Sequence, residues 1–222
     1  MFLSMAAHAK IIDLRNLLAE RFPPPAHTTT RRLRSDVSVL DEPIGGGLPC
    51  GAITELVSPA ASAGTASLIR AFVHCAYRDN YFLALIDGSD SFDPCGLANA
   101  CLQHLLWVRC SKAGEGMRAA DLLLRDGNFS LVIVDLVLNA PEQLRKIPQT
   151  NWYRLQRLVE AVPTACLVLT RYEMVNSAQL KLVLKNSWDI QTFENEDALS
   201  QLRIVRRSHL EPELRSQKSA VS

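Results

Sequence analysis

The residues best suited to chemistry in this sequence lie in a turn of small residues, SPAASAGTAS, at positions 58–67. A loop that binds phosphate needs glycines so that backbone N–H groups can wrap the phosphate, and a lysine that reaches the terminal phosphates. Here Ser58 replaces the first glycine, and Gly64 stands where the lysine should be. The turn therefore indicates a degenerate nucleotide site, with an ordinary small-residue turn into a helix as the simpler interpretation.

A second candidate site is a cluster of basic residues near the end of the chain. Arg203, Arg206 and Arg207 lie close together in the sequence, and Lys181 and Lys185 precede them. The whole chain carries 24 Lys and Arg against 23 Asp and Glu, a formal net charge of +1, so no global field favours nucleic acid or a membrane. Such clusters usually form a solvated face, and a weak DNA contact is kept as a hypothesis.

The six cysteines include no C-x-x-C pair and fall mostly in apolar segments, which is typical of buried thiols in a reduced cytosolic protein. His74 beside Cys75, and His104 near Cys101, lack the repeated ligand spacing of structural zinc sites, so no metal site is predicted. The opening MFLSMAAHAK has no basic stretch before its apolar residues, and no run reaches the roughly 18 apolar residues of a membrane span. These features predict a cytoplasmic protein without a membrane partner.

The elements that would position these residues alternate between apolar strands and helices. Uniformly apolar strands suit a sheet covered on both faces, and strand–helix alternation implies parallel strands with right-handed crossovers. The predicted fold class is therefore α/β, with a mostly parallel central sheet flanked by helices. In chain order the predicted elements are AITELV, helix 65–78, FLALID, helix 93–106, helix 116–126, LVIVDL, helix 151–161, TACLVLT, helix 176–186, and the closing strands WDIQTF and LRIVRR.

Both ends of the chain are predicted to lie outside this domain. An apolar face at helical spacing predicts an amphipathic helix over residues 5–21, and three prolines then end it. This face would dock on a partner protein, on a second copy or on its own domain, and it consists of Ile11, Leu14, Leu17 and Leu18. The predicted organisation is a docking helix at 1–22, a Pro/Thr/Arg linker at 23–36, the α/β domain at 37–208 and a mobile tail at 209–222.

The stretch LDEPIGGGLPCGAITELVSPAASAGTAS, residues 40–67, resembles the RecA family's segment of the type LD-x2-x-GGGLP-x-G-x-I-x-E-I-x-GP-x-x-SGKT. LIDGSDSFDP is similar to that family's second-strand segment, and LVIVDL is similar to its Walker B strand. The similarity runs from about Leu40 to Arg207, and LD followed by GGGLP-x-G-x-x-x-E is its most specific part. The resemblance implies a RecA-like core.

Carried over residue by residue, the resemblance places the family's phosphate loop on Ser58 to Thr65, with Thr65 keeping the magnesium-binding hydroxyl. Asp135 keeps the Walker B carboxylate, Ser89 replaces the water-activating glutamate, and Arg171 replaces the glutamine that senses the γ-phosphate. The resemblance thus implies loss of ATP hydrolysis, while Arg70 and Arg171 leave weak ATP and magnesium binding open. The implied degenerate site consists of Ser58, Pro59, Ser62, Gly64, Thr65, Asp135 and Arg171.

Short RecA relatives with an N-terminal arm, the GGGLP signature and an eroded phosphate loop resemble the ImuA group. This resemblance implies a non-catalytic accessory protein of bacterial SOS-induced translesion mutagenesis. Such a protein assembles with an inactive Y-family polymerase relative, ImuB, and with an error-prone polymerase, and RecA itself is a further candidate partner. A SulA-like cell-division inhibitor and a recombination-mediating RecA-like ATPase are the alternatives, and the missing lysine argues most directly against the ATPase.

Overall fold

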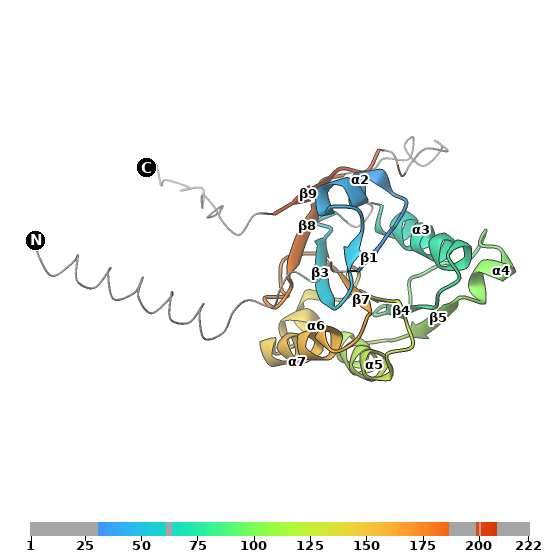
Figure 1. Ribbon diagram of the computed structural model, residues 1–222. Coiled ribbons are helices and arrows are strands. Elements are labelled where there is room, and N and C mark those ends of the chain that lie inside the picture. Colours follow the sequence, from blue (N-terminus) through green and yellow to red (C-terminus); the bar gives the residue numbers. More distant parts are fainter. Residues whose placement is uncertain (1–30, 61–63, 187–198, 200, 208–222) are drawn as a thin grey trace, which may run out of the picture. The chain divides into compact units, whose positions relative to one another are not determined.

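Figure 1 shows the chain as a computed structural model that describes residues 31–60, 64–186, 199 and 201–207. The described residues belong to one compact unit that begins at Arg31. The predicted docking helix at 1–22, with its face of Ile11, Leu14, Leu17 and Leu18, lies outside the described residues. So do the predicted tail at 209–222 and the predicted strand WDIQTF.

A mostly parallel sheet forms the centre of the described domain, in the order β5-β4-β6-β7-β3-β8-β9. All neighbouring strands in it run parallel except β9, which is antiparallel to β8. This arrangement confirms the predicted α/β class and is consistent with a RecA-like core. The strands are β3 (Ala52–Val57), β4 (Leu83–Asp87), β5 (Leu105–Arg109), β6 (Leu131–Asp135), β7 (Ala165–Thr170), β8 (Leu180–Leu184) and β9 (Ile204–Arg206).

Helices cover the two faces of the sheet, with α2 and α3 on one side and α5, α6 and α7 on the other (Figure 1). The central strands are buried because alternate side chains point to opposite faces, and each face has its own apolar core. Among the described residues, no helix is both long and apolar enough to cross a membrane. The helices are α2 (Ser38–Asp41), η1 (Glu42–Ile44), α3 (Thr65–Arg78), α4 (Asn99–Leu102), α5 (Ala113–Asp126), α6 (Pro141–Arg145) and α7 (Gln149–Glu160).

The predicted helix at 93–106 is wrong. Only Asn99–Leu102 is helical, and the apolar residues that follow form β5, the strand at one edge of the sheet. Pro94 interrupts the predicted helix near its start, and so does Gly96, which has a φ of +80°. The run LLWVR then pairs with β4 in parallel register, so the apolar spacing that resembled a helix face belongs partly to a strand.

The predicted helix at 176–186 is also wrong, because these residues contain β8, which pairs in parallel with β3. Its apolar residues Leu180, Leu182 and Leu184 alternate with partly buried ones, which is the period of a strand. The strand starts next to Gln179, whose backbone N–H donates to Ile53 O and whose Oε1 accepts from Ile53 N. Pairing with β3 therefore overrides the local helical spacing.

The end of the segment that we predicted as a linker, 23–36, lies within the domain. β1 (Arg32–Leu33) pairs antiparallel with β2 (Leu48–Pro49), and the Arg32 guanidinium donates to the carbonyls of Ile44 and Gly47. Gly47 has a φ of +132°, and a Cβ atom there would lie 2.4 Å from the Leu33 carbonyl oxygen. Gly47, the last glycine of the GGGLP signature, therefore allows the close approach of this turn to the backbone of β1.

Candidate functional site at the carboxyl edge of the sheet

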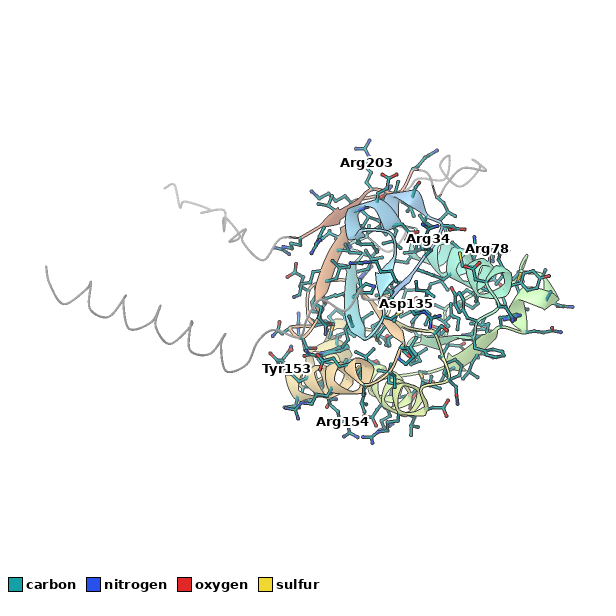
Figure 2. All side chains as sticks on the ribbon, viewed as in Figure 1. Arg34, Arg78, Asp135, Tyr153, Arg154 and Arg203 are labelled. Atoms are coloured by element: carbon teal, nitrogen blue, oxygen red, sulfur yellow. The ribbon has the colours of Figure 1, made fainter. Side chains whose placement is uncertain are left out.

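The predicted nucleotide-site residues lie at the carboxyl ends of neighbouring parallel strands. Ser58 follows β3, Asp135 ends β6, and Arg171 follows β7, and these strands are adjacent in the order β6-β7-β3. Asp135 lies near the centre of the view in Figure 2. Ligands of open parallel sheets collect at this edge, so the fold brings these predicted residues together where a nucleotide would bind.

The turn after β3 is held to the end of β7 by its own backbone. Ser58 is fully buried, its N–H donates to Thr170 O at 2.7 Å, and its hydroxyl donates to Ala60 O at 3.0 Å. Pro59 is exposed, whereas Ser62 lies outside the described residues. The Ser58 hydroxyl is therefore engaged inside the turn and does not replace the missing glycine as a phosphate contact.

Gly64 stands immediately before α3 with a φ of +96°, a backbone conformation that favours glycine over lysine. Thr65, the first residue of α3, is 7% exposed. No lysine occurs in the sequence between Ser58 and Arg70. The described part of the turn thus provides the N-terminus of α3 for a phosphate group, but it has no lysine side chain that could reach the phosphate.

The two arginines proposed to compensate for the lysine differ in their surroundings. Arg70 on α3 donates through Nη1 to the carbonyl oxygens of Asp93, at 3.3 Å, and Cys95, at 2.7 Å, so it ties α3 to the loop after β4. Arg171 follows β7 and is exposed. Arg171 is therefore the better placed of the two to meet an anion at this edge.

Asp87 at the end of β4 organises the loop that follows it. Its carboxylate accepts hydrogen bonds from the backbone N–H groups of Ser91 and Phe92, both at 2.8 Å, and from the N–H of Ser89 at 3.3 Å. The indole N–H of Trp107 on β5 donates to the same carboxylate at 3.3 Å. The second-strand segment LIDGSDSFDP thus has a structural carboxylate in Asp87, which sequence reasoning did not single out.

Ser89, at the position of the water-activating glutamate, has a hydroxyl that donates to Ser91 Oγ at 3.1 Å. The neighbouring Asp90 forms a two-pronged ion pair with Arg109 of β5, with N–O distances of 2.6 and 2.8 Å. The Arg109 guanidinium also lies over the Trp107 ring, 5.0 Å from its centroid. The Asp90 carboxylate is therefore paired with Arg109 at the edge of the sheet.

Asp135 is partly buried beside Asp87, its register partner on β4. Burial raises the pKa of Asp135 to about 6, and the nearby Asp87 carboxylate raises this pKa further. The backbone N–H of Val137, which donates to Oδ1 at 3.0 Å, acts in the opposite direction and lowers it. A carboxyl group with this pKa is partly protonated near neutral pH. Because a metal ion binds the ionised form, this shift disfavours magnesium chiefly below about pH 6.

Replacing Asp135 by Asn tests this electrostatic arrangement. The pKa of an Asp in the unfolded chain is about 3.9, below the value of about 6 in the folded chain, so the folded state binds this proton more tightly. The free energy of unfolding therefore falls as the pH rises from about 4 to about 6. Asp135→Asn should therefore raise the free energy of unfolding at pH 8 by about 1–3 kcal/mol and change it little near pH 4. Urea unfolding at both pH values measures this. Equal effects at the two pH values, or a loss of stability at pH 8, would contradict it.

A buried carboxylate that sequence reasoning missed lies in the middle of β3. Glu55 is fully buried, and its Oε1 accepts hydrogen bonds from the backbone N–H groups of Met174, at 2.8 Å, and Val175, at 3.0 Å. Its Oε2 lies 3.5 Å from Lys181 Nζ on β8, and that ammonium also lies 3.8 Å from Glu173. Glu55 is the final glutamate of the GGGLP-x-G-x-x-x-E pattern, inside the apolar run AITELV, and the sequence predicted no structural role for it. Glu55 fixes the loop that joins β7 to β8.

The three arginines of the predicted DNA patch do not form one surface. Alternation along β9 puts Arg206 on the opposite face from Val205, and the flanking Arg203 and Arg207 share the Val205 face. Arg207 forms an ion pair with Glu173, so its charge is partly neutralised. Arg203 is exposed, at the top of the view in Figure 2. The hypothesis of DNA contact thus depends chiefly on Arg203 and on the exposed Lys185, whose backbone N–H donates to Arg203 O at 2.8 Å.

The His and Cys pairs in the sequence do not assemble into a metal site within the described ranges, where no group of three potential ligands is found. Cys101 Sγ lies 3.6 Å from His74 Nδ1, and His104 Nδ1 lies 3.1 Å from the Tyr81 carbonyl oxygen. Burial raises the pKa of the Cys75 thiol to about 11, and the nearby Asp79 and Asp41 add to this shift. Cys95 is exposed, and the other five cysteines are buried thiols.

Comparison with known proteins gives partial matches to RecA. No family model matches the sequence. Over 102 residues the chain is 29% identical to Protein RecA of Xylella fastidiosa (strain M23) and 30% identical to that of Xanthomonas axonopodis pv. citri (strain 306). It is 31% identical over 101 residues to Protein RecA of Acinetobacter baumannii (strain AYE). The matches support a RecA-like family.

The RecA-like similarity is limited in extent. It covers 45% of this chain against the first two of these proteins and 44% against the third, and in each case 29% of the RecA protein. The matched region is thus less than a third of each relative. The similarity agrees with the RecA-like fold, and the activity and partners of this chain are matters for proposal.

Proposed function

We propose that this chain is a RecA-like protein that does not hydrolyse ATP and acts by assembling with other proteins. The observation that carries the proposal is the turn between β3 and α3. Gly64, with its φ of +96°, occupies the position of the phosphate-binding lysine, and the Ser58 hydroxyl is engaged with Ala60 O. Phosphoryl transfer depends on positioning and charge stabilisation at the γ-phosphate, and both are weakened here.

The biological setting in this proposal comes from the resemblance to the ImuA group of a short RecA-like chain with a predicted N-terminal arm, the GGGLP signature and an eroded phosphate loop. It places the chain in the bacterial cytoplasm, in DNA-damage-induced translesion mutagenesis. Its partners would be an ImuB-like inactive Y-family polymerase and an error-prone polymerase, with RecA as a further partner. The partial similarity to RecA supports a role in DNA repair or recombination at this coarser level.

The purified chain is expected to release no phosphate from ATP above a buffer control, because Gly64, Ser89 and Arg171 replace three groups that act on the γ-phosphate. Gly64→Lys alone should not restore turnover, and it should lower the free energy of unfolding by about 1 kcal/mol, since lysine is strained at this φ. A phosphate-release assay with magnesium measures turnover. Hydrolysis by the parent chain that disappears in Asp135→Ala would overturn this part of the proposal.

The assembly role is tested by co-purifying the chain with an ImuB-like protein and the error-prone polymerase. A stable complex is expected without nucleotide, because the proposed role does not use ATP binding. The matched comparison is a tubulin-like cell-division protein, the target of the SulA-like alternative. Binding to that protein, with none to the polymerase components, would contradict the proposed role in mutagenesis.

A further inference from the structure

A groove runs between α5 and α7 on the outer surface of the helical layer, away from the sheet. It consists of two adjoining hollows of about 510 and 620 Å³, which share Gly114, Met117, Arg118 and Asn151. Figure 1 shows α5 and α7 side by side below the sheet, and Figure 2 labels Tyr153 and Arg154 on α7. None of the residues that line the groove belongs to the predicted degenerate nucleotide site.

The floor of the groove is apolar and has room for a side chain. Met117 and Leu155 line it and are buried, and Leu122 is 67% exposed at one end. Gly114 belongs to the first turn of α5, and a Cβ atom there would have no heavy atom within 4 Å. An apolar side chain of a partner can therefore occupy the space above Gly114, next to Met117 and Leu155.

The rim of the groove is cationic. Lys112, Arg118 and Lys146 line it, and among the described residues their side chains pair with no carboxylate. The two lining acids are already engaged. Asp121 is paired with both Arg125 and Arg154, and Glu115 accepts the backbone N–H of Ser111 at 3.0 Å. Within the described residues, three lining cations without an ion pair thus face one such lining carboxylate, Glu115, and the groove has a net positive charge around an apolar floor.

We propose that this groove binds an acidic amphipathic segment of a partner protein. An apolar side chain of that segment lies over Gly114 against Met117 and Leu155, and its carboxylates face Lys112, Arg118 and Lys146. Charge complementarity selects the acidic partner, and the apolar floor selects an amphipathic one. The inference rests on the proposed assembly function and supplies the chemistry of the partner.

A protein segment fits this groove better than a nucleic acid. None of the described residues that line it is aromatic, so bases would have no ring on which to stack. Single-stranded DNA is therefore the comparison ligand in the test.

The test uses the full chain and a fluorescent designed peptide of about 15 residues, with leucines on one helical face and glutamates elsewhere. A second peptide has glutamines in place of the leucines, and the third ligand is a single-stranded oligonucleotide. Anisotropy titrations are expected to show that the leucine peptide binds at least about tenfold more tightly than either of the others. Equal binding of the glutamine peptide or the oligonucleotide would overturn the proposal.

Three variants localise the binding. Gly114→Phe fills the hollow and Arg118→Glu reverses a rim charge, and each should weaken binding of the leucine peptide at least about tenfold. Arg157→Glu makes the same charge change on an exposed position of α7 that does not line either hollow, and it should leave binding unchanged. Gly114→Phe should not lower the melting temperature, since a Cβ atom at this position meets open space and glycine is the weaker helix former. Unchanged peptide binding by Gly114→Phe would overturn the proposal.

The groove and the assembly function fail in different ways. If Gly114→Phe keeps the polymerase components bound as tightly as the parent chain does, the groove inference is wrong and the assembly function stands. If the parent chain binds the leucine peptide at the groove but neither polymerase component, the proposed function is wrong and the groove stands.

Discussion

Glu55→Ala is expected to lower the free energy of unfolding by about 3–5 kcal/mol, the range for breaking one side of a buried ion pair. The substitution leaves the backbone N–H groups of Met174 and Val175 without their acceptor, and it leaves Lys181 facing Glu173 alone. Because a domain of this size is stable by only about 5–15 kcal/mol, the loss is large. Urea unfolding with a fluorescence or circular-dichroism readout measures it.

Two further variants separate the role of the hydrogen bonds from the role of the charge. Glu55→Gln keeps an acceptor for the two N–H groups, so it should cost less than Glu55→Ala. Lys181→Met should be destabilising in the parent chain, because it leaves a buried carboxylate unpaired, and close to neutral in the Glu55→Gln background. A cost below about 1 kcal/mol for Glu55→Ala would show that Glu55 does not fix the loop between β7 and β8. Additive effects of Glu55→Gln and Lys181→Met on the free energy of unfolding would show that the two side chains do not interact.

Gly88→Ala is expected to destabilise the chain by about 2–3 kcal/mol. Its Cβ atom would lie 2.3 Å from Asn139 Oδ1 and 2.7 Å from the carbonyl oxygen of Asp135. The Gly88 backbone is held on both sides, since its N–H donates to Asp135 O at 2.9 Å and its carbonyl accepts from Asn139 Nδ2 at 2.6 Å. The clash therefore falls on the connection between β4 and β6, at the candidate site.

Gly114→Ala is the matched control for this prediction. Gly114 lies in α5 with open space around its Cβ position, so alanine should raise the free energy of unfolding by about 0.5–1 kcal/mol through its higher helix propensity. The two variants make the same chemical change in opposite surroundings. Thermal or urea unfolding of both, side by side, measures the difference. A Gly88→Ala chain as stable as the parent would contradict the close approach of β4 and β6.

The central strands were predictable because complete burial imposes a composition that is visible in the sequence. AITELV, FLALID, LVIVDL and TACLVLT are short, apolar and bounded by polar or small residues, and they correspond to β3, β4, β6 and β7. The helices α3, α5 and α7 were predictable for the complementary reason, since each has one apolar face on the sheet.

The strand β8 was predicted as a helix, and the predicted helix at 93–106 ran into the first two residues of β5, because these short apolar runs also fit helical spacing. What decides their structure is pairing with a partner that is far away in the sequence, β4 for one and β3 for the other. Periodicity is a local property and contains no information about such partners. The short helix α6 was missed because its five residues are too few to show a period.

The apolar pattern predicted strand ends next to Ser58, Asp135 and Arg171, and the resemblance to RecA gave these residues and Gly64 their expected roles; that the strands are neighbours in the order β6-β7-β3 is seen only in the folded chain. The sequence also showed which groups are missing, since a lysine is present or absent whatever the fold. The pKa and the hydrogen bonds of these residues depended on tertiary structure. Burial next to Asp87 raises the pKa of Asp135, and the end of β7 holds the turn at Ser58. Glu55, Gly88 and the groove between α5 and α7 are visible only in the folded chain, because each depends on neighbours from other elements.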